Sequence, residues 1–351
     1  MISIAMATYN GERFLEQQLC SLNEQTILPN ELVVCDDGSS DRTPEILAQF
    51  RGHALFPVQL VINERRLGWR ENFLKAASLC TSDYIAFCDQ DDIWLPGKIS
   101  VVSRYLDEDR CLLLQHGFRL IDGEGKFVSG EVKYDEIKYA GPAHDVRWRV
   151  NYGMTQIFHR SLLQFWHLWE LSEDHFIAGG KMAHDQWIAF LGSLFDKTIT
   201  IDDVLIHYRQ HNTNIIGFRL PGRQSGAING WKNLSINLSR IYGEGDEFRK
   251  KREDIIRGLQ RRETAAAARE KIIELMIAQV PVERSGSLRA HLGYYRDFRR
   301  YQSQRLLTYI SGTRTERLRA AVRNYRQGLY EAHGRQGARD AMVDVIYGVA
   351  S

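Results

Sequence analysis

The first hundred residues alternate short β-branched runs with stretches of helical periodicity, and this alternation restricts the fold more than any other feature of the chain. Strands are predicted at residues 2–8, 31–35, 58–62 and 84–88. Helical patterns fill the gaps between them, at residues 13–25, 42–50, 69–79 and 96–106. Strand and helix in this order predict an α/β fold with a Rossmann-like, mainly parallel, doubly wound sheet that binds ligands at the carboxyl ends of its strands.

The rest of the chain divides into a mixed region and a helical one. Between residues 111 and 216, strands are predicted at 111–120 and 154–159, a hairpin near Gly123, helices at 162–171 and 185–193, and a strand pair at 197–201 and 204–209. Arg-rich helical stretches follow at 246–279, 288–310 and 314–331. We therefore predict two domains, residues 1–218 and a basic, mainly helical C-terminal region at 219–351.

Charge is distributed unevenly between these two parts. Residues 1–218 contain 20 Lys and Arg against 30 Asp and Glu, a net charge of −10, whereas residues 219–351 contain 26 against 14, a net charge of +12. A basic region of this kind predicts an anionic partner, such as a phospholipid surface or a phosphorylated lipid. Nucleic acid is disfavoured, because no recognition motif accompanies the charge.

Several classes of protein are excluded by what the sequence lacks. No apolar run approaches the roughly 20 residues of a membrane-spanning helix, and the first residues are typical of a strand rather than a leader, so we expect a cytoplasmic protein. The five cysteines have neither CxxC nor Cys/His spacing, which disfavours disulfides and zinc and favours buried thiols. The turn after the first strand reads TYNGE, and the chain has no P-loop, so neither a dinucleotide-binding nor a P-loop motif is present.

Three carboxylates follow the fourth predicted strand directly, in the stretch FCDQDDIWLP. Asp89 and Asp91 are two residues apart, so on extended backbone their side chains would point the same way. Crowded carboxylates repel one another unless a cation compensates, and a divalent ion that carries a diphosphate would do so. The alternative is a solvated acidic turn.

The motifs ATYNGERFLEQQLCSLNEQT, VVCDDGSSDRT and FCDQDDIWLPGKI, in this order and spacing, resemble the inverting family 2 glycosyltransferases, which have a GT-A fold. The resemblance continues through GMTQIFHRSLL, AHDQWIAFLGS and IHYRQHNTNIIG, a set similar to bacterial rhamnosyltransferases of O-antigen or related cell-wall polysaccharide synthesis. It covers roughly residues 1–218. It implies a nucleotide-sugar donor, a saccharide or lipid-linked saccharide acceptor, and a divalent cation, Mg²⁺ or Mn²⁺.

For the donor, the resemblance implies a nucleoside pocket lined from the ends of the first two strands. The residues that it places at the nucleotide sugar are Thr8, Tyr9, Asn10, Glu12, Asp37, Asn72, Asp89, Gln90 and Arg209. Asp37 would accept a hydrogen bond from the pyrimidine ring, and Arg209 would face the diphosphate. For Asp36 and Asp37 the alternative is a role in capping the next helix.

For the chemistry, the resemblance implies a metal site and a base. Asp91 would be the principal metal ligand, helped by Asp89 and by a late histidine, His211. Asp185 in AHDQW would remove the proton from the acceptor hydroxyl. The alternatives for Asp185 are a helix N-terminal charge favoured by the dipole and a local hydrogen bond with His184.

The C-terminal region has no motif that identifies a family. Its first long helix carries an apolar stripe flanked by arginines, formed by Ile255, Ile256, Leu259, Ala266, Ile273 and Ile277. A basic amphipathic helix can lie on an anionic membrane, which predicts peripheral attachment at the inner face of the cell membrane. The alternative is packing on the catalytic domain or on a second subunit of a homodimer.

The expected function is an inverting sugar transfer in cell-surface polysaccharide synthesis. The expected donor is dTDP-rhamnose, and the expected acceptor is a lipid-linked saccharide. The alternative is a non-catalytic scaffold of a polysaccharide assembly complex. The set Asp89, Asp91 and Asp185 disfavours that alternative, because a protein that only binds has no need of a base beside a metal.

Overall fold

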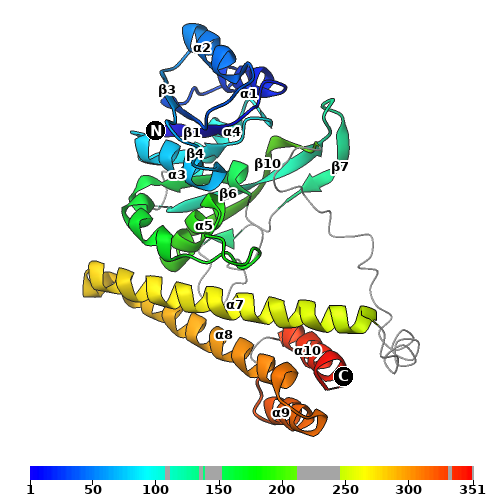
Figure 1. Ribbon diagram of the computed structural model, residues 1–351. Helices are drawn as coiled ribbons and strands as arrows, with labels where there is room; N and C mark the ends of the chain where they lie inside the picture. The colour runs from blue at the N-terminus through cyan, green and yellow to red at the C-terminus, as the bar shows by residue number, and fades with distance from the viewer. Residues whose placement is uncertain (107–110, 134–136, 139–151, 212–245, 331–333, 350–351) are drawn as a thin grey trace. The chain divides into compact units, whose positions relative to one another are not determined.

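A computed structural model describes residues 1–106, 111–133, 137–138, 152–211, 246–330 and 334–349 (Figure 1). Its residues form two compact units. The first comprises Met1–Glu170 and Met182–Phe218, and the second comprises Leu171–Lys181 and Arg219–Ser351. The predicted boundary at residue 218 lies outside the described residues, so the division into two domains stays a prediction.

The first unit is built on one sheet, whose order in the described residues is β3-β2-β1-β4-β9-β6-β10-β5. Its first four strands are β1 (Ile2–Thr8), β2 (Glu31–Asp36), β3 (Val58–Ile62) and β4 (Tyr84–Cys88). They are parallel, with β1 between β2 and β4, as the strand–helix alternation predicts. Their carboxyl ends therefore meet at one edge of the sheet.

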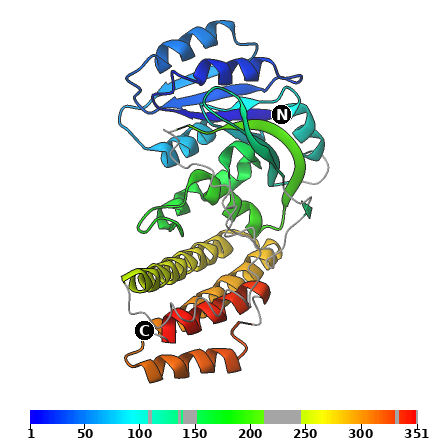
Figure 2. The same ribbon diagram turned by 90° about the vertical axis from the view of Figure 1, so that its right-hand side faces the viewer.

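Helices cover both faces of this parallel part. Helices α1 (Leu15–Asn23) and α2 (Thr43–His53) lie on one face, and α3 (Trp69–Leu79) lies on the other (Figure 2). Every residue of β1 is buried, which explains why the strand reads as a continuous apolar run rather than an alternating one. The backbone N–H of Gly68, directly before α3, donates to Asp37, which follows β2, so the start of α3 lies beside the carboxyl end of β2.

The second half of the sheet is mixed rather than parallel. Strand β9 (Gln156–His159) runs antiparallel to both β4 and β6 (Leu113–Ile121). Strand β10 (Thr198–Arg209) is parallel to β6 and antiparallel to β5 (Ile93–Trp94). The remaining elements here are α4 (Lys98–Leu106), β7 (Phe127–Val132), β8 (Ile137–Lys138), the 3-10 segments η2 (Gly153–Thr155) and η3 (Arg160–Leu171), and α5 (His184–Leu194).

Three details differ from the sequence prediction. The expected strand pair at 197–201 and 204–209 is one strand, β10, because both parts pair with β6 in the same direction and only a register shift lies between them. Residues 160–171 form a 3-10 helix rather than an α-helix. Cys20 is exposed, whereas the other four cysteines are buried thiols as expected.

The described part of the second unit is helical. It contains α7 (Asp246–Gln279), η4 (Val282–Arg284), α8 (Gly286–Ile310), α9 (Arg314–Arg326), α10 (Gly334–Val343) and a final π-helical turn, η6 (Asp344–Val349). Helix α7 packs along α8, and Leu259, Ala266 and Ile273 of its apolar stripe are buried. Packing within the unit therefore accounts for the stripe that the sequence offered as a membrane face.

A buried polar cluster joins the last helices to α8. The guanidinium of Arg305 donates to Asp344 Oδ2 at 2.8 Å and Oδ1 at 2.9 Å, and to Asp340 Oδ2 at 2.6 Å. Tyr309 and Tyr330 donate their hydroxyls to Asp344, each at 2.9 Å. Because one guanidinium binds both buried carboxylates, Asp340 of α10 and Asp344 of η6 are fixed to α8.

Candidate active site

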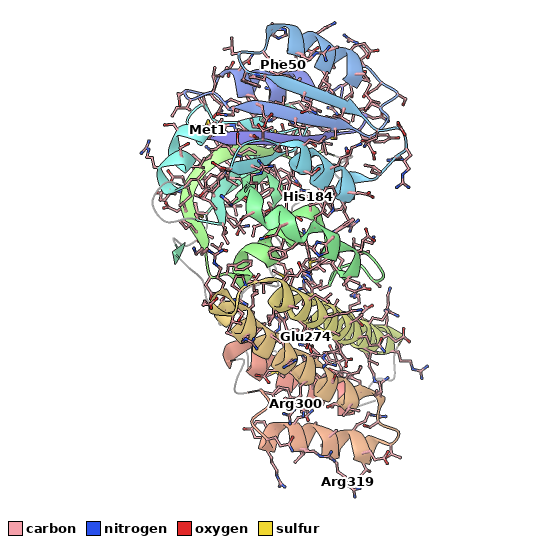
Figure 3. All side chains as sticks on the ribbon, turned by 90° about the vertical axis from the view of Figure 1, so that its left-hand side faces the viewer. Met1, Phe50, His184, Glu274, Arg300 and Arg319 are labelled. Carbon is pink, nitrogen blue, oxygen red and sulfur yellow. The ribbon has the colours of Figure 1, made fainter. Side chains whose placement is uncertain are left out.

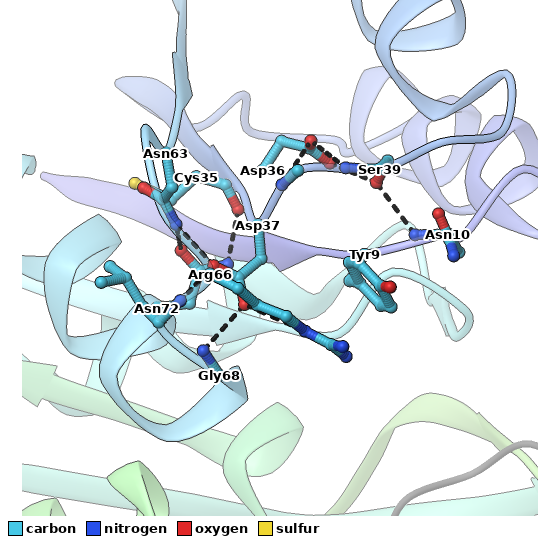
Figure 4. A network of polar contacts seen from close by, with 12 residues as sticks. Tyr9, Asn10, Cys35, Asp36, Asp37, Ser39, Asn63, Arg66, Gly68 and Asn72 are labelled. Atoms are coloured by element: carbon cyan, nitrogen blue, oxygen red, sulfur yellow. Dashed lines mark hydrogen bonds and ion pairs between the residues drawn. The ribbon is translucent and has the colours of Figure 1, made fainter.

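Most of the residues proposed from the sequence lie where β1, β2 and β4 end. Asp36, the last residue of β2, orders the turn that follows it. Its carboxylate accepts hydrogen bonds from Thr8 Oγ1 at 2.8 Å and Ser39 Oγ at 2.5 Å, and from the Ser39 backbone N–H at 2.8 Å (Figure 4). Asp36 and Thr8 are both buried. Asp36 thus orders the turn that leads to α2 but does not cap that helix, whose N-cap residue is Arg42 and has no side-chain cap.

Asp37 holds the loop before α3 in place. Its Oδ1 accepts from Asn63 Nδ2 at 2.9 Å and from the Leu67 backbone N–H at 2.7 Å, and its Oδ2 accepts from the Gly68 N–H at 2.8 Å (Figure 4). Asn72 is buried and continues the network, since it accepts from Asn63 and donates to the Cys35 carbonyl, each at 2.8 Å. A pyrimidine N–H would therefore donate to a carboxylate that already accepts hydrogen bonds from Asn63, Leu67 and Gly68.

Tyr9 presents the exposed aromatic surface of this region. Its side chain is 37% exposed, and the guanidinium of Arg66 stands 3.9 Å from its ring centroid. Arg66 also lies 4.0 Å from Asp37 Oδ2. A flat ring and a cation beside a buried carboxylate are groups that can stack a base and meet a phosphate.

The loop after β1 is held by its neighbours. Asn10 has a positive φ of 47°, and its side chain accepts from the Ser40 N–H at 2.9 Å. Glu12 accepts from the Arg42 N–H at 3.0 Å, which uses one of its oxygens within the fold. The side chain of Gln90 bonds both the N–H and the carbonyl of Tyr9, at 3.0 and 3.2 Å. Gln90 thereby ties the loop after β4 to the loop after β1.

Carboxylates gather at the end of β4 and the start of α5. Burial raises the pKa of Asp89 well above its ordinary value, and the charges of Asp91 and then Asp185 add to that increase. Burial likewise raises the pKa of Asp92, with further contributions from Asp91 and Asp89. The structure therefore brings Asp185, nearly a hundred residues away in the chain, into the electrostatic field of the acidic loop.

The ends of β10 and of the acidic loop are joined by two contacts. His211 Nε2 lies 2.8 Å from Asp91 Oδ2, and both side chains are largely buried. The backbone N–H of Arg209 donates to Asp92 Oδ1 at 2.9 Å. The two side chains that the sequence proposes as metal ligands are thus in direct contact, and their role at a metal stays a prediction.

Arg209 is only 1% exposed, and its guanidinium is engaged within the protein. It donates to the Asp91 carbonyl at 2.8 Å, to Gln17 Oε1 at 2.5 Å and to the Asp122 carbonyl at 3.3 Å. These bonds fix the backbone of Asp91. The predicted contact of Arg209 with a diphosphate stays a prediction, and its observed bonds are those of a positioning residue.

Lys98 is a residue that the sequence reasoning missed. Its side chain is buried, and Nζ donates to the Met154 carbonyl at 2.8 Å and lies 3.6 Å from the Trp94 ring centroid. Burial lowers its pKa to about 7, against the influence of Cys88, Asp92 and Asp89, which raise it. The signal was its spacing of four from Val102 on α4, which places a lysine on an apolar face.

Asp185 lies in the first turn of α5, and its Oδ1 accepts from the Gln186 N–H at 2.7 Å. It also helps burial to raise the pKa of the Tyr152 hydroxyl to about 12. Its neighbour His184 does not form the local pair that was considered. The His184 ring (labelled in Figure 3) is buried and stacks on Phe73 with 3.9 Å between ring centroids.

The donor set around Asp91 suits a hard divalent cation in its chemistry. It offers the carboxylates of Asp89 and Asp91 and the imidazole of His211, and Asp92 Oδ2 is a buried oxygen without a hydrogen-bond partner in the described structure. In the described ranges no three such side chains converge into a ready-made ligand triad. A cation would relieve the mutual repulsion of these carboxylates.

In sequence, this chain is similar to glycosyltransferases. Residues 3–164 match glycosyl transferase family 2. The Escherichia coli UDP-Glc:alpha-D-GlcNAc-diphosphoundecaprenol beta-1,3-glucosyltransferase WfgD is 31% identical over 144 residues, which cover 39% of this chain and 54% of that one. The Shigella flexneri dTDP-rhamnosyl transferase RfbG is 38% identical over 98 residues, 27% of this chain and 34% of that one. The chain thus spans between about a third and about half of these relatives.

Comparison with solved structures addresses the fold. The crystal structure of Staphylococcus aureus TarS 1-349 in complex with UDP superposes with a TM-score of 0.51 at 16% identity and covers 86% of this chain and 91% of that chain. None of the helices in the described ranges has both the length and the apolar character needed to cross a bilayer. The chain therefore has the predicted GT-A fold followed by a helical region, and over residues 3–164 its sequence is similar to glycosyl transferase family 2.

Proposed function

We propose that this chain is an inverting glycosyltransferase that moves a sugar from a nucleotide diphosphate to a saccharide in cell-surface polysaccharide synthesis. The observation that carries the proposal is the gathering of Asp89, Asp91 and Asp185 beside the carboxyl ends of parallel strands. The match of residues 3–164 to the family supports it. A scaffold protein is the weaker alternative, because it has no use for three mutually repelling carboxylates.

In this proposal Asp91, with Asp89 and His211, holds Mg²⁺ or Mn²⁺. The bound ion would neutralise charge that develops on the departing diphosphate. Arg209 fixes the backbone of Asp91 by donating to its carbonyl, so the ligand does not move when charge changes. Gln90 likewise fixes the loop after β4 to the loop after β1, because it accepts a hydrogen bond from the Tyr9 N–H.

Asp185 accepts the proton of the attacking hydroxyl. Its place in the first turn of α5 stabilises the ionised form that a base requires, since a helix N-terminus favours negative charge. The hydroxyl oxygen then displaces the nucleotide diphosphate in one in-line step, which inverts the configuration at the sugar carbon. No covalent enzyme intermediate is needed.

The nucleoside would stack on Tyr9 and meet Asp37, whereas Thr8, Asn10, Glu12 and Asn72 shape the pocket through bonds within the protein. We propose dTDP-rhamnose as the donor, supported by the similarity to a dTDP-rhamnosyl transferase. We propose a lipid-linked saccharide as the acceptor, supported by the diphosphoundecaprenol in the printed name of a relative. This acceptor would place the protein at the inner face of the membrane. There we propose the helical unit as a peripheral anchor, with a homodimer interface as the alternative.

The test uses the purified full chain. Thermal shifts are measured with dTDP-rhamnose, UDP-glucose and UDP-GlcNAc in the presence of Mn²⁺, and each donor is then incubated to follow release of the nucleotide. We expect dTDP-rhamnose to give the largest shift and a release that stops when the metal is chelated. A shift with another donor would correct the sugar. No shift and no release with any donor would overturn the proposal in favour of the scaffold.

A further inference from the structure

Helix α9 exposes two parallel stripes of different chemistry. Leu318, Val322 and Tyr325 follow one another at spacings of four and three and are 47%, 41% and 73% exposed. Each is followed in the chain by an arginine, so Arg319, Arg323 and Arg326 form a second exposed stripe beside the first. Figure 3 shows Arg319 on the outer side of this helix.

The buried side of the same helix is accounted for by packing within the unit. Ala321 and Asn324 are buried, and Asn324 Nδ2 donates to the Gln304 carbonyl of α8 at 3.0 Å. Thr313 and Glu316 form a capping box at the N-terminus, and Glu316 is the one acidic residue within α9. The exposed apolar stripe therefore takes no part in the packing just described, whereas the arginines interact with their own helix, Arg319 with the charge of Glu316 and Arg323 and Arg326 with its C-terminal turn.

An arginine-lined pocket lies at the N-terminal end of α9. It has a volume of about 330 Å³ and is lined by Arg249, Arg252, Glu253 and Arg317. Arg252 donates to the Tyr309 carbonyl in the last turn of α8, and Arg317 donates to the Gly312 carbonyl between α8 and α9 at 3.3 Å, so both cations are held by backbone carbonyls. Three guanidinium groups against one carboxylate make this pocket suited to a phosphate group.

We propose that α9 and the Arg249–Arg252–Arg317 pocket form a docking surface for an anionic phospholipid bilayer. The apolar stripe enters the interface beside the acyl chains, the arginine stripe meets head-group phosphates, and one phosphate enters the pocket. Tyr325 suits the head-group level, because tyrosine has an apolar ring and a polar end. The inference rests on the proposed function in one respect only, that a lipid-linked acceptor brings the protein to a membrane.

The experiment is vesicle flotation of the full chain, with no donor or acceptor present, so its result does not depend on sugar transfer. Vesicles of phosphatidylcholine are compared with vesicles that also contain phosphatidylglycerol. We expect binding to the anionic vesicles that weakens as salt is raised. Arg319→Gln with Arg323→Gln should weaken binding about 30-fold, since each cation near an anionic surface contributes about 1 kcal/mol, a factor of about five.

The matched control removes the same charge elsewhere in the unit. Arg296→Gln with Arg300→Gln changes two exposed arginines of α8, and we expect its affinity to stay within about twofold of the wild type. Leu318→Ser with Val322→Ser keeps the charge and should weaken binding about tenfold. Arg249→Gln tests the pocket and should cost about fivefold. Far-UV circular dichroism verifies that each variant is folded.

Three outcomes would overturn the inference. One is the absence of binding to anionic vesicles while donor release is normal, which leaves the proposed function standing. Another is an equal loss in the control pair, which would indicate a diffuse electrostatic attraction. The third is a dimer in light scattering that Leu318→Ser with Val322→Ser converts to monomer, which would make α9 a subunit interface.

Discussion

At the scale of single residues, the acidic loop after β4 separates carboxylates that look alike in the sequence. Asp91 contacts His211, Asp92 accepts from the backbone of Arg209, and Asp89 lies in the field of Asp185. These differences arise because the end of β10 brings Arg209 and His211 to the loop, whereas α5 brings Asp185. Neighbours from distant parts of the chain thus give each carboxylate its own chemistry.

The role of Asp185 can be tested by a substitution that keeps its shape. Asp185→Asn removes the proton acceptor, and we expect turnover to fall by roughly 10²–10⁴ while the thermal shift given by the donor is retained. The control is Glu45→Gln, an exposed acidic residue in the first turn of α2, which should leave turnover unchanged. Normal turnover in Asp185→Asn would remove it from the chemistry.

His184 gives a prediction about pH and stability. Burial, helped by Arg70, lowers its pKa to about 3, below the ordinary value of 6.5. Below about pH 6.5 the His184 imidazole therefore binds a proton in the unfolded chain but not in the folded protein. The free energy of unfolding falls as the pH drops below that value. Between pH 7.5 and 5.5 the wild type should lose about 1.4 kcal/mol more than His184→Asn. Urea unfolding at both pH values measures this loss, and equal losses in the two proteins would show that folding does not lower the pKa of His184.

At the scale of elements, α5 is brought to the site by close packing against β6. A Cβ on Gly192 would stand 2.7 Å from Leu113 Cβ and 3.1 Å from its Cδ2, so only glycine allows the helix to approach the strand this closely. The same helix carries Asp185 in its first turn. The packing of α5 therefore decides where the proposed base lies.

Gly192→Ala should destabilise the first unit by about 1–3 kcal/mol, because Leu113 must move. It should also lower turnover by displacing Asp185, while donor binding at the other loops persists. Gly52→Ala in α2 is the matched control, since a Cβ at this position would meet open space. It should raise the free energy of unfolding by about 0.5–1 kcal/mol. Urea denaturation followed by circular dichroism compares the two, and a neutral Gly192→Ala would show that α5 has room to shift.

At the scale of the whole molecule, the two compact units differ in charge and in what holds them together. The first is organised by a sheet with apolar residues on both faces, and the second by paired helices and the buried cluster around Arg305. This difference predicts that each unit can lose stability by itself.

Arg305→Leu tests that independence. It leaves Asp340 and Asp344 buried without their cation, and we expect the helical unit to lose about 3–5 kcal/mol while the donor still raises the melting temperature of the first unit. The control is Arg300→Leu, an exposed position of the same helix, with a change within about 0.5 kcal/mol. Hydrogen exchange resolves the two units, and uniform loosening of both would show that they unfold together.

The sequence by itself determined the first four strands, their helices and the carboxyl-end edge, because strand and helix patterns depend on local periodicity. It also determined the long helices of the basic region within a few residues. It did not join 197–201 and 204–209 into one strand, and it linked the start of α5 to the loop after β4 only through the family resemblance, not through periodicity. Those depend on pairing with β6 and on packing at Gly192, which are contacts between distant residues.

Only the tertiary structure decided which groups are used inside the protein. The buried lysine at 98, the guanidinium of Arg209 turned to backbone carbonyls and the apolar stripe of α7 packed on α8 all follow from burial. The same packing left α9 with an exposed apolar stripe beside its arginines. Burial depends on the sum of all neighbours, and periodicity along the chain reports only the nearest of them.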